Sequence, residues 1–358
     1  MAVALPSDSE SSVDLRAETE RTRGARAPAR LWPVLIASTV AILSVLVGAI
    51  AFVAMWGRDS GSGSAQALLE IPEPYDAVRA ERYLRMICDL GPRPSGSAAM
   101  IKQQELLSDF FTKAGATVEL QAFEARHPQS GDTVVMKNLI ARFSPQRPER
   151  YLICAHYDTR PFPDRDPVNP RGRFVGANDG GSGVAGLMEL SHHLGSLADN
   201  VGVDLVLFDG EELVYGERIG EYFLGSTHFA REYASRRPVN PYRAGILLDM
   251  IGDRELRIYY ERNSWNFARD VCKSVFEVAS VLKADAFVPR IRHEVRDDHL
   301  PLNEIAKIPT IDLIDFDYPR PGIGVQQYWH TTKDIPENCS GHSIATVIYV
   351  VHQWLMRQ

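Results

Sequence analysis

Two adjacent carboxylates, Glu211 and Glu212, follow two residues after the largely apolar run Val203–Phe208. Such a short run is typical of a buried parallel strand, so the two acids are expected where the strand leaves the sheet at its carboxyl end. Open α/β sheets bind their ligands at that edge. Two carboxylates there can divide the work, one holding a metal and the other moving a proton, whereas a pair without a metal would be an ordinary solvated loop.

Three more polar residues are expected at the same edge. His156 follows the run Tyr151–Ala155, Asp249 follows the run beginning at Ala244, and Asp179 lies in a glycine-rich loop that opens a helix. His330, in the stretch Tyr-Trp-His-Thr, is a further candidate from far along the chain. Histidine and carboxylate ligands without a thiolate suit a catalytic zinc that keeps an open position.

Each of these residues also has a purely structural interpretation. Asp179 is flanked by glycines and fits an ordinary turn or helix cap. A histidine after a strand is often only a hydrogen-bonded core residue. Asp249 is harder to dismiss, because a carboxylate between Leu248 and Met250 is costly unless it is paired or binds a metal.

Alternating helical and strand patterns surround these residues. Helices are expected at Tyr75–Leu90, Ala98–Ala114, Gly183–Leu194, Trp265–Leu282 and Ser343–Leu355. Strands are expected at Thr117–Phe123, Val134–Phe143, Tyr151–Ala155, Val203–Phe208, Ala244–Met250, Leu256–Tyr260 and Thr310–Ile314. This alternation predicts a single three-layer α/β domain, with a mixed, mostly parallel sheet between helices and the first two strands paired as an edge hairpin.

Composition excludes some classes of function. The chain has 358 residues, ordinary globular values of 45% hydrophobic and 24% charged residues, and a net charge of −7. A negative net charge argues against nucleic acid as a partner, because phosphate binding requires a basic surface. The four cysteines form no CxxC pair, which makes a cysteine-type zinc site improbable.

The N-terminal part differs from the rest. Residues 1–30 are poor in large apolar residues, which predicts a disordered tail. Residues 31–57 carry no charge, are rich in Val, Ile, Leu and Ala, and are long enough to cross roughly 30 Å of hydrocarbon as a helix. Residues 58–74 follow as a flexible linker, and residues 75–358 as the folded domain.

Charge distribution around residues 31–57 predicts the orientation of the segment. Four arginines precede it between residues 21 and 30, whereas only Arg58 follows closely. The positive-inside rule therefore places the N-terminus in the cytoplasm and the folded domain outside it, attached to a single-pass membrane anchor. A cleaved signal peptide is the competing interpretation, although the apolar core is long for one and begins late.

Seven motifs in order, from about Tyr75 to the C-terminus, resemble those of the M28 zinc-peptidase and glutaminyl cyclase superfamily. They are Gly91-Pro92-Arg93-Pro94-Ser95-Gly96, Ala155-His156-Tyr157-Asp158, Gly176-Ala177-Asn178-Asp179, Phe208-Asp209-Gly210-Glu211-Glu212, Leu247-Leu248-Asp249-Met250-Ile251-Gly252, Asp297-Asp298-His299 and Trp329-His330-Thr331. Each is weak alone, but together and in order they are highly specific.

The resemblance implies a zinc ion held by Asp179, Glu212 and His330, with Glu211 as the general acid/base. Members of the superfamily with two metals add His156 and Asp249 as ligands, with Asp179 bridging. Both residues are present here, so the ligands permit one zinc or two. Asp158 is expected to orient His156 through a hydrogen bond.

Two chemistries fit this frame. A glutaminyl-peptide cyclotransferase converts the N-terminal Gln of a peptide to pyroglutamate and releases ammonia, with Glu211 carrying a proton from the amine to the departing ammonia. An M28 aminopeptidase hydrolyses N-terminal residues with a water activated by the metal, and Glu211 then takes the proton of that water. Either way the partners are the N-termini of peptides or proteins.

The amino-acid sequences of two motifs favour the cyclotransferase. Asp297-Asp298-His299 resembles the cyclase motif, which implies that Asp297 and Asp249 form an acidic network with Glu211. Trp329 before His330 implies an aromatic wall for substrate beside the metal. Against this, the second tryptophan of animal cyclases is missing between residues 213 and 222. A third alternative, a binding domain on an inactive peptidase fold, predicts a lost ligand or a lost Glu211, and neither is lost.

Overall fold

The computed structural model describes residues 69–358 except 217–218, 237 and 318–327, and these belong to the unit Leu68–Gln358. The predicted N-terminal tail, the predicted membrane anchor and most of the predicted linker lie outside the described residues. Within the described part of the chain, no helix combines the length and the apolar character needed to cross a bilayer.

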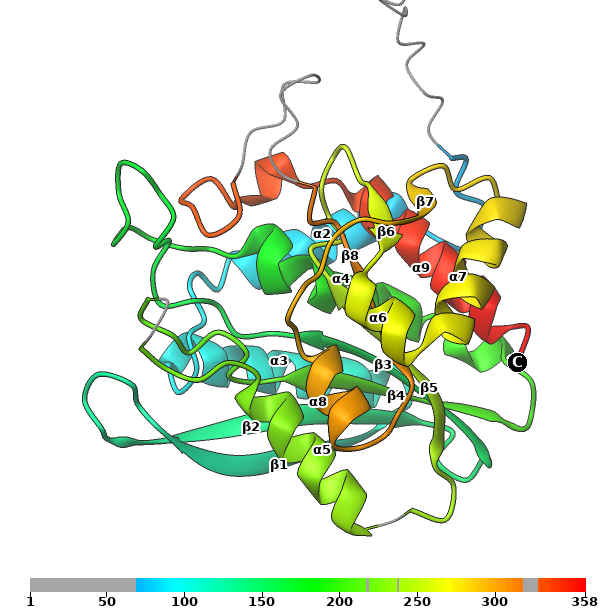
Figure 1. Cartoon of the computed structure of the whole chain (residues 1–358), viewed down its shortest axis with the longest axis horizontal. Coiled ribbons are helices and arrows are strands. Elements are labelled where there is room, and N and C mark those ends of the chain that lie inside the picture. Colours follow the sequence, from blue (N-terminus) through cyan, green and yellow to red (C-terminus); the bar gives the residue numbers. More distant parts are fainter. Residues whose placement is uncertain (1–68, 217–218, 237, 318–327) are drawn as a thin grey trace, which may run out of the picture. The chain divides into compact units, whose positions relative to one another are not determined.

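Two helices and then three strands begin the described chain, and strands and helices are interleaved from β3 onward (Figure 1). The strands are β1 (Thr117–Arg126), β2 (Thr133–Phe143), β3 (Glu149–His156), β4 (Val201–Phe208), β5 (Tyr242–Asp249), β6 (Ile258–Tyr260), β7 (Phe287–Ile291) and β8 (Thr310–Ile314). The α-helices are α2 (Ala77–Cys88), α3 (Ala98–Lys113), α4 (Gly183–Ser191), α5 (Leu224–Arg236), α6 (Arg262–Phe267), α7 (Arg269–Val281), α8 (His299–Glu304) and α9 (Gly341–Leu355).

Six strands form the main sheet in the order β1-β2-β4-β3-β5-β8. The β1–β2 and β2–β4 pairs are antiparallel, whereas β4–β3, β3–β5 and β5–β8 are parallel. The predicted mixed sheet with an edge hairpin is therefore confirmed. Because β4, β3 and β5 are parallel neighbours, their carboxyl ends meet at one edge.

Helices cover both faces of this sheet, and the side chains of the central strands alternate between them. Ile153 of β3 packs in the larger apolar cluster, which includes residues of α2, α3, α4 and α9. Its neighbour Leu152 packs in the second cluster, with Phe229 of α5 and Leu302 of α8. In Figure 1, α5 and α8 lie on the near side of the sheet and α3 on the far side. Burial on both faces explains why β4 is buried along its whole length.

Several elements differ from the sequence prediction. The strand predicted at Leu256–Tyr260 pairs with β7 in a separate two-stranded sheet instead of joining the main one. The helix predicted at Trp265–Leu282 is divided at Ala268, whose φ of −137° is not helical. The break lets α6 contact β8 while α7 contacts α9. Helices α5 and α8 and strand β7 were not predicted; Pro289 within β7 weakens its strand pattern.

Candidate metal and catalytic site

Polar residues from three neighbouring strands meet at the carboxyl edge of the sheet. His156 is the last residue of β3, Asp249 is the last residue of β5, and Glu211 and Glu212 follow the end of β4. All four side chains are buried. The site residues expected at strand ends therefore lie together, because β3 is inserted between β4 and β5.

Asp179 reaches the same place from a kinked turn, Ala177–Ser182, at the start of α4. The Asp334 carboxylate holds this turn by accepting hydrogen bonds from the Asn178 and Asp179 N–H groups at 2.7 and 3.1 Å. Gly180 follows at φ +81°, and a Cβ there would lie 3.0 Å from His156 Cε1. The turn therefore needs glycine both for its backbone and for the approach of the imidazole.

Asp179, Glu212 and His330 form one group of possible metal ligands, with one ligand atom each within 4.8 Å of the others. His330 Nε2 lies 2.8 Å from Glu212 Oε1 and 3.3 Å from Asp179 Oδ2. Nitrogen and oxygen ligands of a tetrahedral zinc are roughly 3.3–3.6 Å apart, since each lies about 2.0–2.2 Å from the ion. The donor types and the 3.3 Å separation fit a zinc ion, whereas His330 Nε2 and Glu212 Oε1, at 2.8 Å, lie at hydrogen-bond distance and would move apart around the ion.

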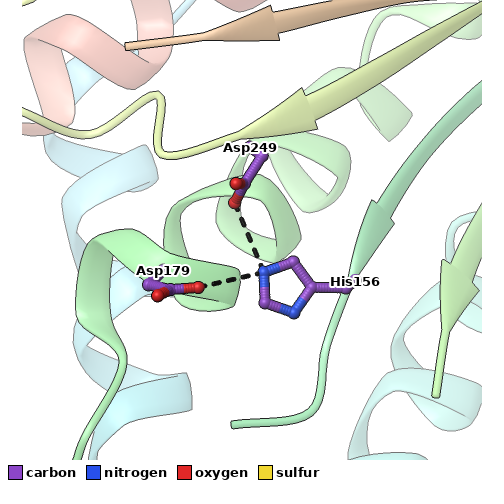
Figure 2. Close-up of side chains that lie close together, drawn as sticks. All are labelled: His156, Asp179 and Asp249. Atoms are coloured by element: carbon purple, nitrogen blue, oxygen red, sulfur yellow. Dashed lines mark ion pairs between the residues drawn. The ribbon is translucent and has the colours of Figure 1, made fainter. Parts of the chain in front are cut away.

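His156, Asp179 and Asp249 form a second such group, shown in Figure 2. His156 Nε2 lies 3.2 Å from Asp179 Oδ1 and 3.3 Å from Asp249 Oδ1 (Figure 2). Asp179 Oδ2 and Asp249 Oδ1 are buried, and each faces a histidine Nε2 at 3.3 Å without a well-aligned hydrogen bond. Such buried oxygens fit a bound cation, and Asp179 directs one oxygen to each group.

Glu211 lies beside these ligands in a different electrostatic environment. Burial raises its pKa well above the usual range, and the nearby Glu212 carboxylate and then Asp297 and Asp298 add to the rise. Burial also raises the pKa of Asp297, and Asp249 adds to that rise. A raised pKa suits a carboxyl group that must take up and release a proton during a reaction.

Asp179 shows the opposite behaviour. Burial alone would raise its pKa, but hydrogen bonding to His156 and His330 outweighs burial and lowers the pKa below the usual range. It is therefore ionised and ready to bind a cation. The pKa of His156 shifts upward. Burial lowers this pKa, but the carboxylates of Asp158, Asp179 and Asp249 outweigh burial and raise it well above the usual value.

Asp158 faces His156, but at 3.7 Å it does not form the predicted orienting hydrogen bond; its hydrogen bonds go to the acidic pair. Its two oxygens accept hydrogen bonds from the Glu211 and Glu212 N–H groups at 3.1 and 3.0 Å, and Oδ1 lies 3.7 Å from His156 Nδ1. One carboxylate thus fixes the backbone of the acidic pair and also faces the histidine. Spacing from His156 suggested only the second contact, because the first joins residues more than 50 positions apart.

Arg160 and Asp164 are site residues that the sequence prediction missed. The Arg160 guanidinium donates to Glu212 Oε1 at 3.1 Å and to both oxygens of Asp164 at 2.9 Å. Asp164 Oδ1 lies 3.6 Å from His330 Nδ1. This ion pair therefore touches two of the three residues in the first ligand group. Its sequence signal is weak, because charged residues in a loop are usually solvated.

A cavity of about 650 Å³ opens over these residues. Glu211, Glu212, Asp249 and Asp297 line it, together with an aromatic wall. Trp329 lies in that wall with its ring 4.0 Å from the His330 ring, and the Arg165 guanidinium lies 4.1 Å from the Trp329 ring centre. All residues predicted for catalysis, metal binding or substrate contact thus line this cavity except His156. His156 is buried and contacts the residues that line it.

Backbone strain is found at the same place. His330, Met250 and Phe223 have φ values of +56°, +48° and +62°, in the left-handed region that non-glycine residues rarely adopt. Met250 follows Asp249, while His330 and Phe223 line the cavity. Such strain costs about 1–3 kcal/mol per residue and is found mostly at functional sites.

Comparison with known proteins identifies the family. The family model for peptidase family M28 matches residues 138–355, which is more than half of the chain. The glutaminyl-peptide cyclotransferase of Gloydius blomhoffii is 25% identical over 277 residues, covering 68% of this chain and 71% of that protein.

Solved structures give two further matches. The glutaminyl cyclase of Fimbriiglobus ruber is 38% identical with a TM-score of 0.74, over 80% of this chain and 96% of that one. A Zn-dependent exopeptidase from Parabacteroides distasonis is 29% identical with a TM-score of 0.72, over 81% of this chain and 100% of that one. The similar proteins thus include both cyclases and exopeptidases.

Proposed function

The chain belongs to peptidase family M28, and on this premise we propose that it is a zinc-dependent glutaminyl-peptide cyclotransferase. It would convert the N-terminal Gln of peptides or proteins to pyroglutamate and release ammonia. The observation that carries the proposal is the position of Asp297, which lines the same cavity as Asp249 and Glu211. The similarity to glutaminyl cyclases supports the same conclusion.

Asp297 bears on the number of metals. Asp249 contributes to the raised pKa of Asp297, after burial. Burial also raises the pKa of Asp249, although the hydrogen bond with His156 opposes the rise. An Asp249 that holds a proton would be a poor metal ligand. This arrangement favours one zinc, held by Asp179, Glu212 and His330.

A bound zinc would polarise the side-chain amide of the substrate Gln as a Lewis acid. The residues of the chain then have two tasks. Glu211 accepts a proton as the α-amine nitrogen forms a bond to the amide carbon, and it returns that proton to the amide nitrogen as ammonia leaves. No water is consumed. Trp329 forms a wall that holds the Gln side chain, so that the amine is already close to its target.

An M28 aminopeptidase is the second candidate. The observation that favours it is the group His156, Asp179 and Asp249, whose ligand atoms also lie within 4.8 Å of one another and could hold a second metal. In that case Glu211 would take a proton from water during attack on the first peptide carbonyl.

A substrate pair separates the two functions. The domain from residue 68 onward is given a Gln-initiated peptide and a Leu-initiated peptide, and both ammonia and free amino acids are measured. Ammonia from the first peptide without cleavage of either supports the cyclotransferase. Free amino acids from the second peptide would contradict it. About one zinc per chain by elemental analysis agrees with the first outcome, and two with the second.

We also propose that residues 31–57 anchor the enzyme in a membrane with the catalytic domain outside the cytoplasm. The uncharged segment and the preceding arginines support this. The full chain should sediment with membranes and resist extraction by salt, while the chain from residue 68 stays in the supernatant. Release of the full chain by salt alone would contradict the anchor.

A further inference from the structure

Glu261 is a buried carboxylate that does not line the cavity but makes an unusual number of polar contacts. Its Oε1 accepts hydrogen bonds from the Asn263 and Val295 N–H groups at 2.8 and 3.0 Å. Its Oε2 accepts from the Ser264 N–H and Oγ at 2.6 and 2.8 Å, and lies 3.3 Å from His299 Nε2. One side chain thus joins the start of α6 to the segment that leads into α8.

The two distant contacts lie on either side of Asp297. Val295 is two residues before Asp297 and His299 is two residues after it. Asn263 Nδ2 also donates to Val295 O at 2.9 Å, so both backbone polar groups of Val295 are bound to the start of α6. From this bracketing we infer that Glu261 is a positioning residue that holds Asp297 in the cavity.

Asp297 has few other restraints of its own. The Asp298 N–H donates to its Oδ1 at 2.6 Å, which is a contact within the same short segment. The segment is attached to α5 only one residue later, where Ser226 Oγ donates to Asp298 Oδ1 at 2.5 Å. Without the contacts to Glu261, the segment around Asp297 would lose part of its attachment to the start of α6. The Arg262 N–H bond to His293 O at 2.8 Å and the Asn263 Nδ2 bond to Val295 O would remain.

The charge of Glu261 suits this task. Burial would raise its pKa, but the contacts with His299 and the N–H groups of Ser264 and Asn263 lower it to about 2. The carboxylate is therefore ionised at neutral pH, and hydrogen bonds to an ionised acceptor are roughly twice as strong as neutral ones.

Helix capping alone does not account for these contacts. As the residue before α6, Glu261 needs only the N–H groups of Asn263 and Ser264 to serve as a cap. The contacts with Val295 and His299 join positions more than 30 residues away and add nothing to the cap. They indicate that the same carboxylate also holds the segment that carries Asp297 into the cavity.

The inference rests on the proposed role of Asp297, and E261Q tests it. Glutamine keeps the shape of the side chain but places an NH₂ donor against the Ser264 donors and His299. D76A is the matched control, because Asp76 caps α2 by accepting from the Arg79 N–H at 2.9 Å and does not line the cavity. N263A, which removes only the contact to Val295 O, is a milder second variant that keeps the test open if E261Q does not fold.

Two measurements are made on zinc-loaded protein. Amide hydrogen exchange of residues 293–300 should rise at least tenfold in E261Q and stay unchanged in D76A. The kcat for Gln-peptide cyclisation should fall about 10- to 100-fold in E261Q, as expected for a misplaced catalytic group, with KM and zinc content within about twofold. N263A should show the same changes at about a third of the size, and D76A should keep its kcat.

Unchanged exchange in E261Q and N263A would overturn the inference. So would faster exchange with a kcat within twofold of the wild type, because Asp297 would then not depend on its anchors. If the wild-type chain does not cyclise Gln peptides, the proposed function fails, whereas the exchange measurement still decides whether Glu261 holds the segment.

Discussion

Glu211 and Glu212 are neighbours in the chain, yet their surroundings give them different properties. Glu212 lies 3.1 Å from Arg160 Nη1, so its charge has a cationic partner, and it also lies 2.8 Å from His330 Nε2. Glu211 lies against Glu212 itself and other carboxyls, which together with burial raise its pKa. The pair can therefore divide its work, with Glu212 suited to a metal and Glu211 to a proton.

This division predicts different outcomes for the two amide variants. E211Q cannot move a proton, so its kcat should fall about 10²- to 10⁴-fold, while its zinc content stays at the wild-type value. E212Q should lose zinc as well as activity. Steady-state kinetics and elemental analysis of the purified variants check both expectations. An E211Q variant with near wild-type kcat would remove Glu211 from the mechanism.

At the scale of elements, the turn before α4 determines where Asp179 lies. The turn combines left-handed glycines, Gly176 at φ +56° and Gly180 at φ +81°, with the Asp334 anchor. It also contacts the end of β3, since a Cβ on Gly180 would lie 3.0 Å from Asp158 O and from His156 Cε1. A change in the turn would therefore move both Asp179 and His156.

G180A is expected to lower both stability and zinc affinity. A side chain at positive φ costs about 1–2 kcal/mol, which for a domain of this size is about 2–4 °C in Tm per kcal/mol. Displacement of Asp179 should weaken zinc binding about 10- to 100-fold, as measured by competition with a chelator. G195A is the control, because Gly195 is exposed and a Cβ there would meet no atom within 4 Å. Equal zinc affinities for the two variants would contradict the role of the turn.

At the scale of the whole molecule, buried histidines link stability to pH. His352 of α9 contacts Tyr75 and Ser196 through its two ring nitrogens at 2.6 and 3.0 Å. Burial lowers its pKa to about 4, and the neighbouring His193 adds to the effect. Glu189 in the same layer has a pKa of about 2; burial would raise it, but His193 and Arg79 lower it. The two groups therefore act in different pH ranges.

The direction in which stability changes with pH follows from the number of protons bound by the folded and unfolded states. An unfolded histidine titrates near pH 6.5 and folded His352 near 4, so the unfolded state binds more protons between these values. Stability from His352 is present above about pH 6.5 and is lost as the pH falls to 4. The loss for Glu189 occurs only below about pH 4.5.

H352Q should therefore lose less stability on acidification than the wild type. Between pH 7.5 and pH 5 the difference should be about 1 kcal/mol, from 1.36 kcal/mol per pKa unit discounted for partial contact with solvent. Thermal unfolding at both pH values with saturating zinc measures it, and the variant at pH 7.5 supplies the baseline. Parallel losses in the two proteins would exclude His352 as a source of acid sensitivity.

Sequence patterns alone determined much of the layered α/β fold and the position of each acid at a strand end. Strand and helix patterns depend on neighbouring residues, so strand β4 could be predicted from its own apolar run without knowledge of residues far away in the chain. Elements with weaker local patterns were missed, such as β7 with its internal Pro289 and α5 with few buried apolar residues.

Only the tertiary structure decided which residues meet. The strand order, with β3 between β4 and β5, brought His156 between Glu212 and Asp249. Arg160 and Glu261 have contacts that join residues more than 30 positions apart in the chain, and no local pattern encodes such pairs. The physical reason is that propensities act within a few residues, whereas a buried charge is given its partners by the packing of whole elements.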